Sequence, residues 1–174
     1  PGKCIYCPLD ERMPKSYLSD EPAASRALAL RFDPYEQVAR RIEALEKNGH
    51  PTDKIELIIK GGTWGVYPLA YQYWFILRSF EACNNMSLRG AKRRGHPLSS
   101  EPTWHSEEGI PTPPLGARDD IKKLLHKQQK INEKAKHRII GLTLETRPDF
   151  INERNIAVMR ELGCTRVELG VQTT

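Results

Sequence analysis

Three short apolar runs, separated by segments with helical spacing, constrain the fold more than any other feature of this sequence. They are IELIIK at 55–60, RIIGLTL at 138–144 and TRVELGV at 165–171. Runs of this length that are rich in β-branched residues predict buried strands. Strands that alternate with helices pair in parallel through βαβ units. We therefore expect an α/β fold with a parallel sheet.

The segments between these runs carry helix signals. Asp33-Pro34 supplies an N-cap followed by Pro in the first turn, which predicts a helix as far as Gly49. Apolar stripes predict further helices after Pro68, from Asp119-Asp120, and over about 152–162. We expect the last two helices to bury their apolar residues, which are Ile121, Leu124, Leu125, Ile131, Ile156, Met159 and Leu162.

Two stretches lack a regular period. The first thirty residues contain many turn formers and predict a long loop around two cysteines, and residues 84–118 predict an irregular insertion rich in Gly, Pro and Ser. The expected organisation is one domain. It comprises a loop at 1–32, a helix-strand-helix unit at 33–83, the insertion at 84–118, and a basic helix with two further strands and a helix at 119–174.

Binding and catalysis in parallel α/β folds gather where the strands end. Here those ends carry Gly61-Gly62-Thr63, then Glu145 and Arg147, and last Gln172. A Gly-Gly turn lets the backbone approach a ligand, although it can also be only a turn. Glu145 and Arg147 could meet the ammonium and carboxylate groups of a ligand, pair with neighbours, or face solvent. Glu168 and Gln172 are expected to fall on the same face of the last strand. They could belong to a ligand site or to a structural hydrogen-bond network.

The positive charge is concentrated in one part of the chain. Of 27 Lys and Arg and 22 Asp and Glu, residues 84–138 contain twelve of the former and six of the latter. Such a surplus is typical of a surface that binds a polyanion, and equally of a solvated linker and helix face. No apolar run approaches the length of a membrane span, and no secretory signal is visible. The four dispersed cysteines favour a reducing cytoplasm.

Cys4-Ile5-Tyr6-Cys7 is the sharpest local motif. A thioredoxin-type dithiol would begin a helix after a strand, and haem attachment requires His after the second Cys, where this chain has Pro8. A zinc site, a plain loop pair and an iron-sulfur cluster stay open. A cluster needs a further thiolate, which we expect upstream of Pro1 or from another chain. Cys83 and Cys164 lie among apolar residues and are expected to be inert core thiols.

Five segments, taken in order, carry a resemblance to a known family. They are KCIYCP, KSYLSDEPAASRALALRFDPYEQ, IELIIKGGTWGVYP, GLTLETRPD and GCTRVELGVQ. Together they resemble the radical S-adenosylmethionine domain of the Elongator catalytic subunit family, the tRNA carboxymethyluridine synthases. The resemblance implies a partial (β/α)6-type barrel with a 4Fe-4S cluster and bound S-adenosylmethionine. It also implies transfer of a carboxymethyl group from acetyl-CoA to C5 of the wobble uridine of tRNA.

The resemblance assigns roles to individual residues. Cys4 and Cys7 match two cluster ligands, and Gly61, Gly62 and Thr63 match the stretch that binds the amino group of the cofactor. Glu145, Arg147 and Gln172 fall on strand ends that line the family's cofactor and substrate cavity. Lys60 stands where the family commonly has an apolar residue, and it puts a charge at the mouth of the site. We therefore expect a cofactor-binding set of Gly61, Gly62, Thr63 and Gln172 and a catalytic set of Lys60, Glu145 and Arg147.

The expected partners follow from the same resemblance and from the basic stretch. We expect tRNA to contact Arg93, Arg94, Lys122, Lys123 and Lys127. The family's acetyltransferase-like domain would lie downstream of this segment and would hold most of the acetyl-CoA. A homo-oligomer or an Elongator-like assembly is expected, and no membrane partner. Two alternatives stay open: a non-catalytic, zinc-stabilised RNA-binding module, and a radical S-adenosylmethionine enzyme of the same fold with another substrate.

Overall fold

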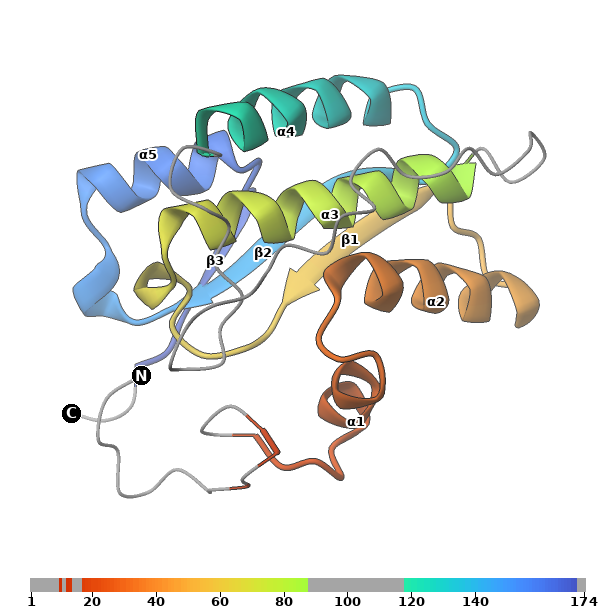
Figure 1. Ribbon diagram of the computed structural model, residues 1–174, viewed down its shortest axis with the longest axis horizontal. Coiled ribbons are helices and arrows are strands. Elements are labelled where there is room, and N and C mark those ends of the chain that lie inside the picture. Colours follow the sequence, from red (N-terminus) through yellow and green to blue (C-terminus); the bar gives the residue numbers. More distant parts are fainter. Residues whose placement is uncertain (1–9, 11, 14–16, 88–117, 172–174) are drawn as a thin grey trace.

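A three-stranded parallel sheet organises the protein (Figure 1). The computed structural model describes residues 10, 12–13, 17–87 and 118–171. Within these ranges the strands are β1 (Lys54–Ile59), β2 (Arg138–Thr146) and β3 (Arg166–Leu169), paired in the order β1-β2-β3. The helices are α1 (Pro22–Ala29), α2 (Pro34–Lys47), α3 (Leu69–Ser87), α4 (Arg118–Asn132) and α5 (Glu153–Glu161), with 3₁₀ turns η1 (Trp64–Val66) and η2 (Pro148–Phe150). The predicted α/β class and the parallel pairing are confirmed.

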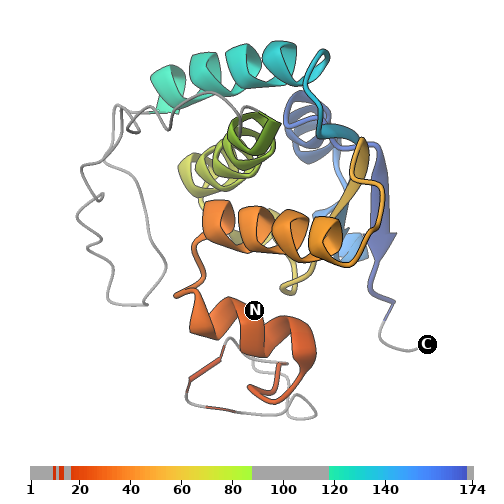
Figure 2. The same ribbon diagram turned by 90° about the vertical axis from the view of Figure 1, so that its right-hand side faces the viewer.

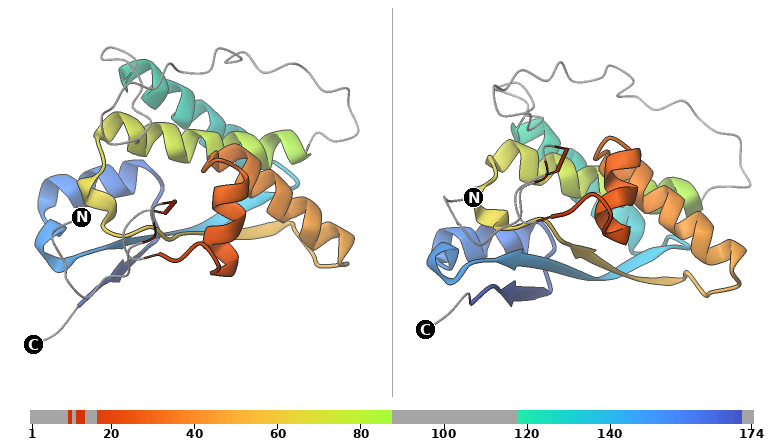
Figure 3. Two further views of the ribbon diagram at one scale, coloured as in Figure 1. Left: turned by 60° about the horizontal axis from the view of Figure 1, so that its bottom comes forward. Right: turned by 90° about the horizontal axis from the view of Figure 1, so that it is seen from below.

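Helices α2, α3, α4 and α5 lie on one side of the sheet (Figures 2 and 3). Helix α3 sits between the sheet and α4, so it is buried on several sides and carries an almost continuous apolar run. Burial of its large side chains against the strands supplies the main hydrophobic stabilisation of the fold. The core members are Ile59, Trp64, Tyr73, Trp74, Ile76, Leu77, Phe80, Ile121, Leu125, Leu142, Leu144, Met159 and Leu162.

The other face of the sheet carries charged side chains, together with the exposed Ile58. Ile59 and Leu144 point into the core, so their neighbours along each strand point to the opposite face. In the register, Ile59 pairs with Leu144 and Glu145 pairs with Glu168, so Lys60, Glu145 and Glu168 follow one another across the three strands. One step further down, Arg166 Nη1 lies 2.9 Å from Glu56 Oε1. We call this surface the open face.

A bulge interrupts the pairing of β1 with β2. Ile55 pairs with Ile139 but Glu56 pairs with Gly141, so Ile140 is the extra residue of β2. Its side chain is 61% exposed. The bulge brings Leu142 and Leu144 onto the core side, and it places Thr143 and Glu145 on the open face.

The predicted helices are confirmed, and α2 has the predicted Asp33 cap, whereas the Asn152 cap of α5 comes from the structure. Asp33 Oδ1 accepts a hydrogen bond from the backbone N–H of Glu36 at 3.0 Å, and Asn152 Oδ1 accepts one from Asn155 at 2.9 Å. These side chains satisfy free N–H groups at the starts of α2 and α5. None of the helices in the described ranges is both long and apolar enough to cross a bilayer.

Several sequence expectations are wrong. Helix α1 occupies 22–29, where a loop was expected, because Pro22 in the first turn and four alanines in eight residues favour a helix without an apolar stripe. Helix α3 continues through 84–87, which the expected insertion had included; residues 88–117 of that insertion lie outside the described ranges. Leu124, Ile131 and Ile156 are 38%, 45% and 43% exposed rather than buried.

Candidate functional site

The chain leaves β1 through the glycine turn Gly61-Gly62-Thr63 and enters η1. Gly61 has φ +156° and Gly62 has φ +83°. The second value lies in the left-handed region, where glycine is favoured. A Cβ added to Gly62 would meet no atom within 4 Å. The turn therefore presents its backbone to open space at the carboxyl end of β1.

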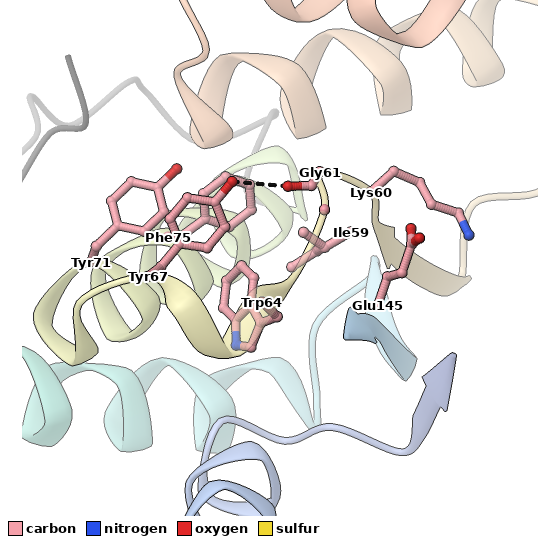
Figure 4. Close-up of a pocket in the computed structure, with 9 residues that line it drawn as sticks. Ile59, Lys60, Gly61, Trp64, Tyr67, Tyr71, Phe75 and Glu145 are labelled. Atoms are coloured by element: carbon pink, nitrogen blue, oxygen red, sulfur yellow. Dashed lines mark hydrogen bonds between the residues drawn. The ribbon is translucent and has the colours of Figure 1, made fainter. Parts of the chain in front are cut away.

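A small pocket of about 50 Å³ opens beside this turn (Figure 4). It has two chemically different walls. One wall is aromatic and comes from η1 and the start of α3, whereas the other carries Lys60 and Glu145 from the ends of β1 and β2. The lining residues are Ile59, Lys60, Gly61, Gly62, Trp64, Tyr67, Tyr71, Phe75 and Glu145. The arrangement fits a ligand with both an apolar or aromatic part and a charged part.

The aromatic wall is a packed stack. The ring centroids of Tyr67 and Tyr71 lie 5.1 Å apart, and those of Tyr71 and Phe75 lie 5.9 Å apart. Tyr67 also meets the edge of Trp64 at 6.0 Å. Burial raises the pKa of both Tyr67 and Tyr71, so both phenols stay protonated at neutral pH.

The polar wall is part of a charge row on the open face. Lys60 Nζ forms an ion pair with Glu168 across the central strand. This hydrogen bond raises the pKa of Lys60, which keeps the ammonium charged at neutral pH. Glu145 lies between them in the sheet and has no hydrogen-bond partner among the residues that the structure describes. The row thus holds two carboxylates for one ammonium, and the Glu145 carboxylate is available to a ligand.

Tyr17 approaches the same site from the segment that follows the cysteine motif. Burial raises the pKa of its phenol, and the negative charge of Glu145 raises it further. The backbone amide of Gly62 donates a hydrogen bond to the Tyr17 oxygen, which lowers the pKa of this phenol. Tyr17 therefore lies against the glycine turn, next to Glu145 and Lys60.

Arg147 is not brought into the pocket. Its guanidinium pairs with the carboxylate of Asp149, with Nε 2.9 Å from Oδ1, and the side chain is exposed. Thr63 is buried next to the pocket without lining it. The turns after β1 and β2 pack closely, because a Cβ on Gly65 would lie only 2.7 Å from Cδ1 of Phe150.

Five predicted site residues lie outside the described residues. They are Cys4, Cys7, Gln172, Arg93 and Arg94. Within the described ranges, no three His, Cys, Asp or Glu side chains are grouped as a metal would require. Cys83 is fully buried, and burial raises the pKa of its thiol to about 12. Cys164 is half-buried, and burial raises the pKa of its thiol as well. Both cysteines have the character of inert thiols.

The three predicted lysines of α4 differ in their surroundings. Lys122 Nζ lies 2.5 Å from Glu161 Oε1 of α5. Lys123 is 80% exposed, with Asp120 Oδ1 at 3.9 Å. Lys127 is also exposed and makes no ion pair within the described residues. Lys123 and Lys127 are therefore available to an outside partner, whereas Lys122 ties α4 to α5.

Six lining or neighbouring residues were not predicted from the sequence: Tyr17, Ile59, Trp64, Tyr67, Tyr71 and Phe75. A signal for three of them was present. Tyr67, Tyr71 and Phe75 follow one another at intervals of four, which on a helix forms one aromatic face beginning just after the glycine turn. Tyr17 had no such signal, because its approach to Gly62 is a long-range contact.

Comparison with known proteins gives related chains of greater length. No family model matches. The chain is 45% identical to a tRNA uridine(34) acetyltransferase of Methanocaldococcus infernus and 38% identical to one of Dehalococcoides mccartyi, in each case over 99% of its own length. It is 33% identical over 98% of its length to Elongator complex protein 3 of Schizosaccharomyces pombe. The chain spans only 27%, 30% and 26% of these three relatives.

A solved structure is similar as well. It is the archaeal Methanocaldococcus infernus Elp3 with an N-terminal deletion, which is 43% identical to this chain and superposes with a TM-score of 0.61. The match covers 84% of this chain and 26% of that one. The α/β arrangement of three parallel strands with covering helices thus recurs in part of a larger protein.

Proposed function

We propose that this chain is part of a tRNA-modifying transferase of the Elongator catalytic subunit family. Its reaction would add a carboxymethyl group, derived from acetyl-CoA, to C5 of the wobble uridine. The similarity of almost the whole chain to relatives whose names specify tRNA uridine 34 carries this proposal. The pocket at the carboxyl ends of β1 and β2 supports it, because its glycine turn and charged wall suit a cofactor with an amino-acid end.

The proposed fold is a partial (β/α)6-type barrel spanning 1–174, with the open face as its interior. Adjacent strands lie about 4.8 Å apart, so β1 and β3 are separated by roughly twice that distance. Two ion pairs nevertheless join β1 to β3, Glu56 with Arg166 and Lys60 with Glu168. The small residues Gly141 and Thr143 of β2 lie between Glu56 and Arg166 in the register, and Glu145 lies between Lys60 and Glu168. Side chains that converge over a central strand suit a sheet that is concave on this face.

The proposed cofactors are S-adenosylmethionine and a 4Fe-4S cluster. Bound together, they would supply the hydrogen abstraction that activates the acetyl group. The glycine turn, with its open backbone, would hold the amino-acid end of S-adenosylmethionine, with Thr63 and Gln172 in the same set. Glu145 would bind a positive or hydroxyl group of a ligand, and Lys60 would meet a negative one. Cys4 and Cys7 would ligate the cluster, with a third thiolate from elsewhere.

The proposed partner is tRNA, bound in part by the basic surface of α4. Lys123 and Lys127 are exposed there, and Arg93, Arg94 and Lys122 belong to the same proposed surface. Acetyl-CoA would bind mainly to a part of the protein beyond this segment. A larger Elongator-like assembly and a cytoplasmic location belong to the same proposal.

The test is tRNA modification by the full-length protein, reconstituted with iron and sulfide without oxygen. We expect carboxymethylated uridine at position 34 after addition of S-adenosylmethionine, a reductant and acetyl-CoA, detected by mass spectrometry of nucleosides. Glu145→Gln should lower the rate at least tenfold, because it removes the free carboxylate of the pocket. Glu36→Gln is the matched control, since Glu36 pairs only loosely with Arg40, at 3.6 Å, on the surface of α2.

Other outcomes would favour the alternatives. Cleavage of S-adenosylmethionine without modified uridine would favour a related enzyme with another substrate. A protein that keeps zinc, cleaves nothing and still binds RNA would favour the zinc-stabilised module.

A further inference from the structure

Tyr67 connects the aromatic wall of the pocket to its glycine turn. The phenol O–H of Tyr67 donates a hydrogen bond to the carbonyl oxygen of Gly61 at 2.9 Å, drawn as a dashed line in Figure 4. At the other end of the residue, the side-chain amide of Gln72 donates to the Tyr67 carbonyl at 2.7 Å. Gln72 is 4% exposed, so this second bond is anchored in the protein interior. The turn is thereby tied through Tyr67 to helix α3.

The glycine turn needs such a tie. Two consecutive glycines have a large conformational freedom that must be lost for the turn to hold one shape. No atom lies within 4 Å of the position of a Cβ on Gly62, so its restraint comes from contacts of the backbone, those of Tyr17 and Tyr67. Tyr67 itself is restrained, because its ring lies between Trp64 at 6.0 Å and Tyr71 at 5.1 Å. A rigid ring with a protonated hydroxyl is therefore the contact that fixes the Gly61 carbonyl.

We propose that Tyr67 is a positioning residue for the ligand of this pocket. By holding the Gly61 carbonyl it fixes the peptide between Gly61 and Gly62, and so the shape of the turn at the edge of the pocket where the polar end of the ligand would bind. A site that is ordered before binding loses less entropy on binding. The identity of the ligand, S-adenosylmethionine, rests on the proposed function. The restraint of the turn by Tyr67 rests on the structure alone.

The test compares Tyr67→Phe with Tyr73→Phe in the full-length protein. Tyr67→Phe removes one hydroxyl and keeps the ring. Tyr73→Phe is the matched control, because the Tyr73 hydroxyl also makes a hydrogen bond, to Glu161 Oε2 at 2.5 Å, but on a side of α3 that does not line the pocket. Two quantities are measured: hydrogen exchange of the Val66 and Tyr67 amides, and the dissociation constant of S-adenosylmethionine by calorimetry.

Tyr67→Phe should accelerate exchange of both amides about fivefold, as the loss of one hydrogen bond implies. These amides are suitable reporters, because they bond to the Thr63 and Trp64 carbonyls at 3.1 and 3.2 Å within η1, the 3₁₀ turn that directly follows the glycine turn. The dissociation constant should rise by a similar factor. Tyr73→Phe should lower the melting temperature without changing either quantity.

Each outcome is decisive. The inference would be overturned if Tyr67→Phe left the hydrogen exchange of the two amides unchanged. It would also be overturned if Tyr67→Phe and Tyr73→Phe accelerated that exchange equally. A protein that binds no S-adenosylmethionine would instead contradict the proposed function, and the exchange rates would still decide whether Tyr67 holds the turn.

Discussion

At the scale of single residues, the site depends on the difference between a paired and an unpaired carboxylate. Glu168 is neutralised by Lys60, whereas Glu145, beside it in the register, has no such partner among the described residues. An unpaired carboxylate at a strand end offers its oxygens to a positive or hydroxyl group of a ligand. Of the two carboxylates in this row, we therefore assign Glu145 to the ligand.

A second carboxylate, Glu46, has a structural role at the other end of the sheet. Its Oε1 accepts a hydrogen bond from Lys136 Nζ at 2.6 Å and from Thr52 Oγ1 at 3.4 Å, and it lies 3.5 Å from Nε2 of the buried His137. The hydrogen bond from Lys136 is the largest cause that lowers the pKa of Glu46. A lowered folded-state pKa stabilises the fold above the unfolded-state value, and that stability is lost as the pH falls through the folded value.

Glu46→Gln should therefore destabilise the protein more at pH 7 than near pH 3. We expect a loss of less than about 1 kcal/mol at pH 7, because the side chain is partly exposed to solvent. Urea unfolding at the two pH values measures the difference, with Glu36→Gln as the control. An equal loss at both pH values would contradict the role assigned to the Glu46 carboxylate.

At the scale of elements, a buried polar network joins α3 and α4 to the start of β2. The Asn132 amide donates to Asn84 Oδ1 at 2.8 Å and to the His137 carbonyl at 3.0 Å. Its own Oδ1 accepts the backbone N–H of Ile139 at 2.7 Å. Asn84 in turn donates to the Gln128 side chain at 2.7 Å. One side chain thus fixes where α4 ends and β2 begins.

Asn132→Ala should lower the free energy of unfolding by about 2 to 3 kcal/mol, because it leaves several buried polar groups without partners. Asn85→Ala is the control, since Asn85 is an exposed neighbour on α3 whose amide donates to the Tyr35 hydroxyl at 3.3 Å and lies outside the buried network. Chemical denaturation measures both variants. A loss for Asn132→Ala no larger than that of the control would show that the network does not stabilise this junction.

The sequence predicted the elements better than it predicted their contacts. Strand runs and caps were sufficient for the parallel sheet and for the starts of α2 and α5, because these signals are local. The spacing of apolar residues predicted that Leu124 and Ile131 of α4 would be buried, but both are exposed. Ile121, Leu125 and Asn132 share the stripe that faces the protein, whereas Leu124 and Ile131 fall on an adjacent stripe that no described element covers. A buried Asn cannot be recognised from spacing alone.

For the candidate site, too, the sequence predicted which strand ends would meet but not the side-chain contacts made there. Parallel strands were enough to predict that the Gly61-Gly62 turn and Glu145 would meet, since strand ends share one edge. The pairing of Arg147 with Asp149 and the bond from Tyr67 to Gly61 depend on the shapes of η1 and η2, which are not encoded in a simple period. Neither contact could be obtained without the structure.

At the scale of the whole molecule, charge separates two surfaces. The open face holds a small number of paired charges at the strand ends, and α4 on the far side of α3 carries exposed lysines. A polyanion would be attracted to α4, while a small ligand with mixed charges would fit the open face. The two surfaces suit a protein that binds a large and a small substrate in different places.

Replacing Lys123 and Lys127 together by Ala should weaken tRNA binding and reduce the slope of log affinity against log salt by about one for each lysine. The control removes Lys47 and Lys54, two lysines of α2 and β1. Filter binding over a series of salt concentrations measures both pairs. If the salt slope is unchanged after Lys123 and Lys127 are replaced, this face of α4 is solvated and does not contact tRNA.

The proposed function requires the full-length protein to cleave S-adenosylmethionine. The product to measure is 5′-deoxyadenosine, after reconstitution with iron and sulfide and reduction without oxygen. We expect a coloured protein that forms this product, and loss of the product in Cys4→Ser and Cys7→Ser. A colourless wild-type protein that retains zinc and forms no 5′-deoxyadenosine would contradict the proposed function.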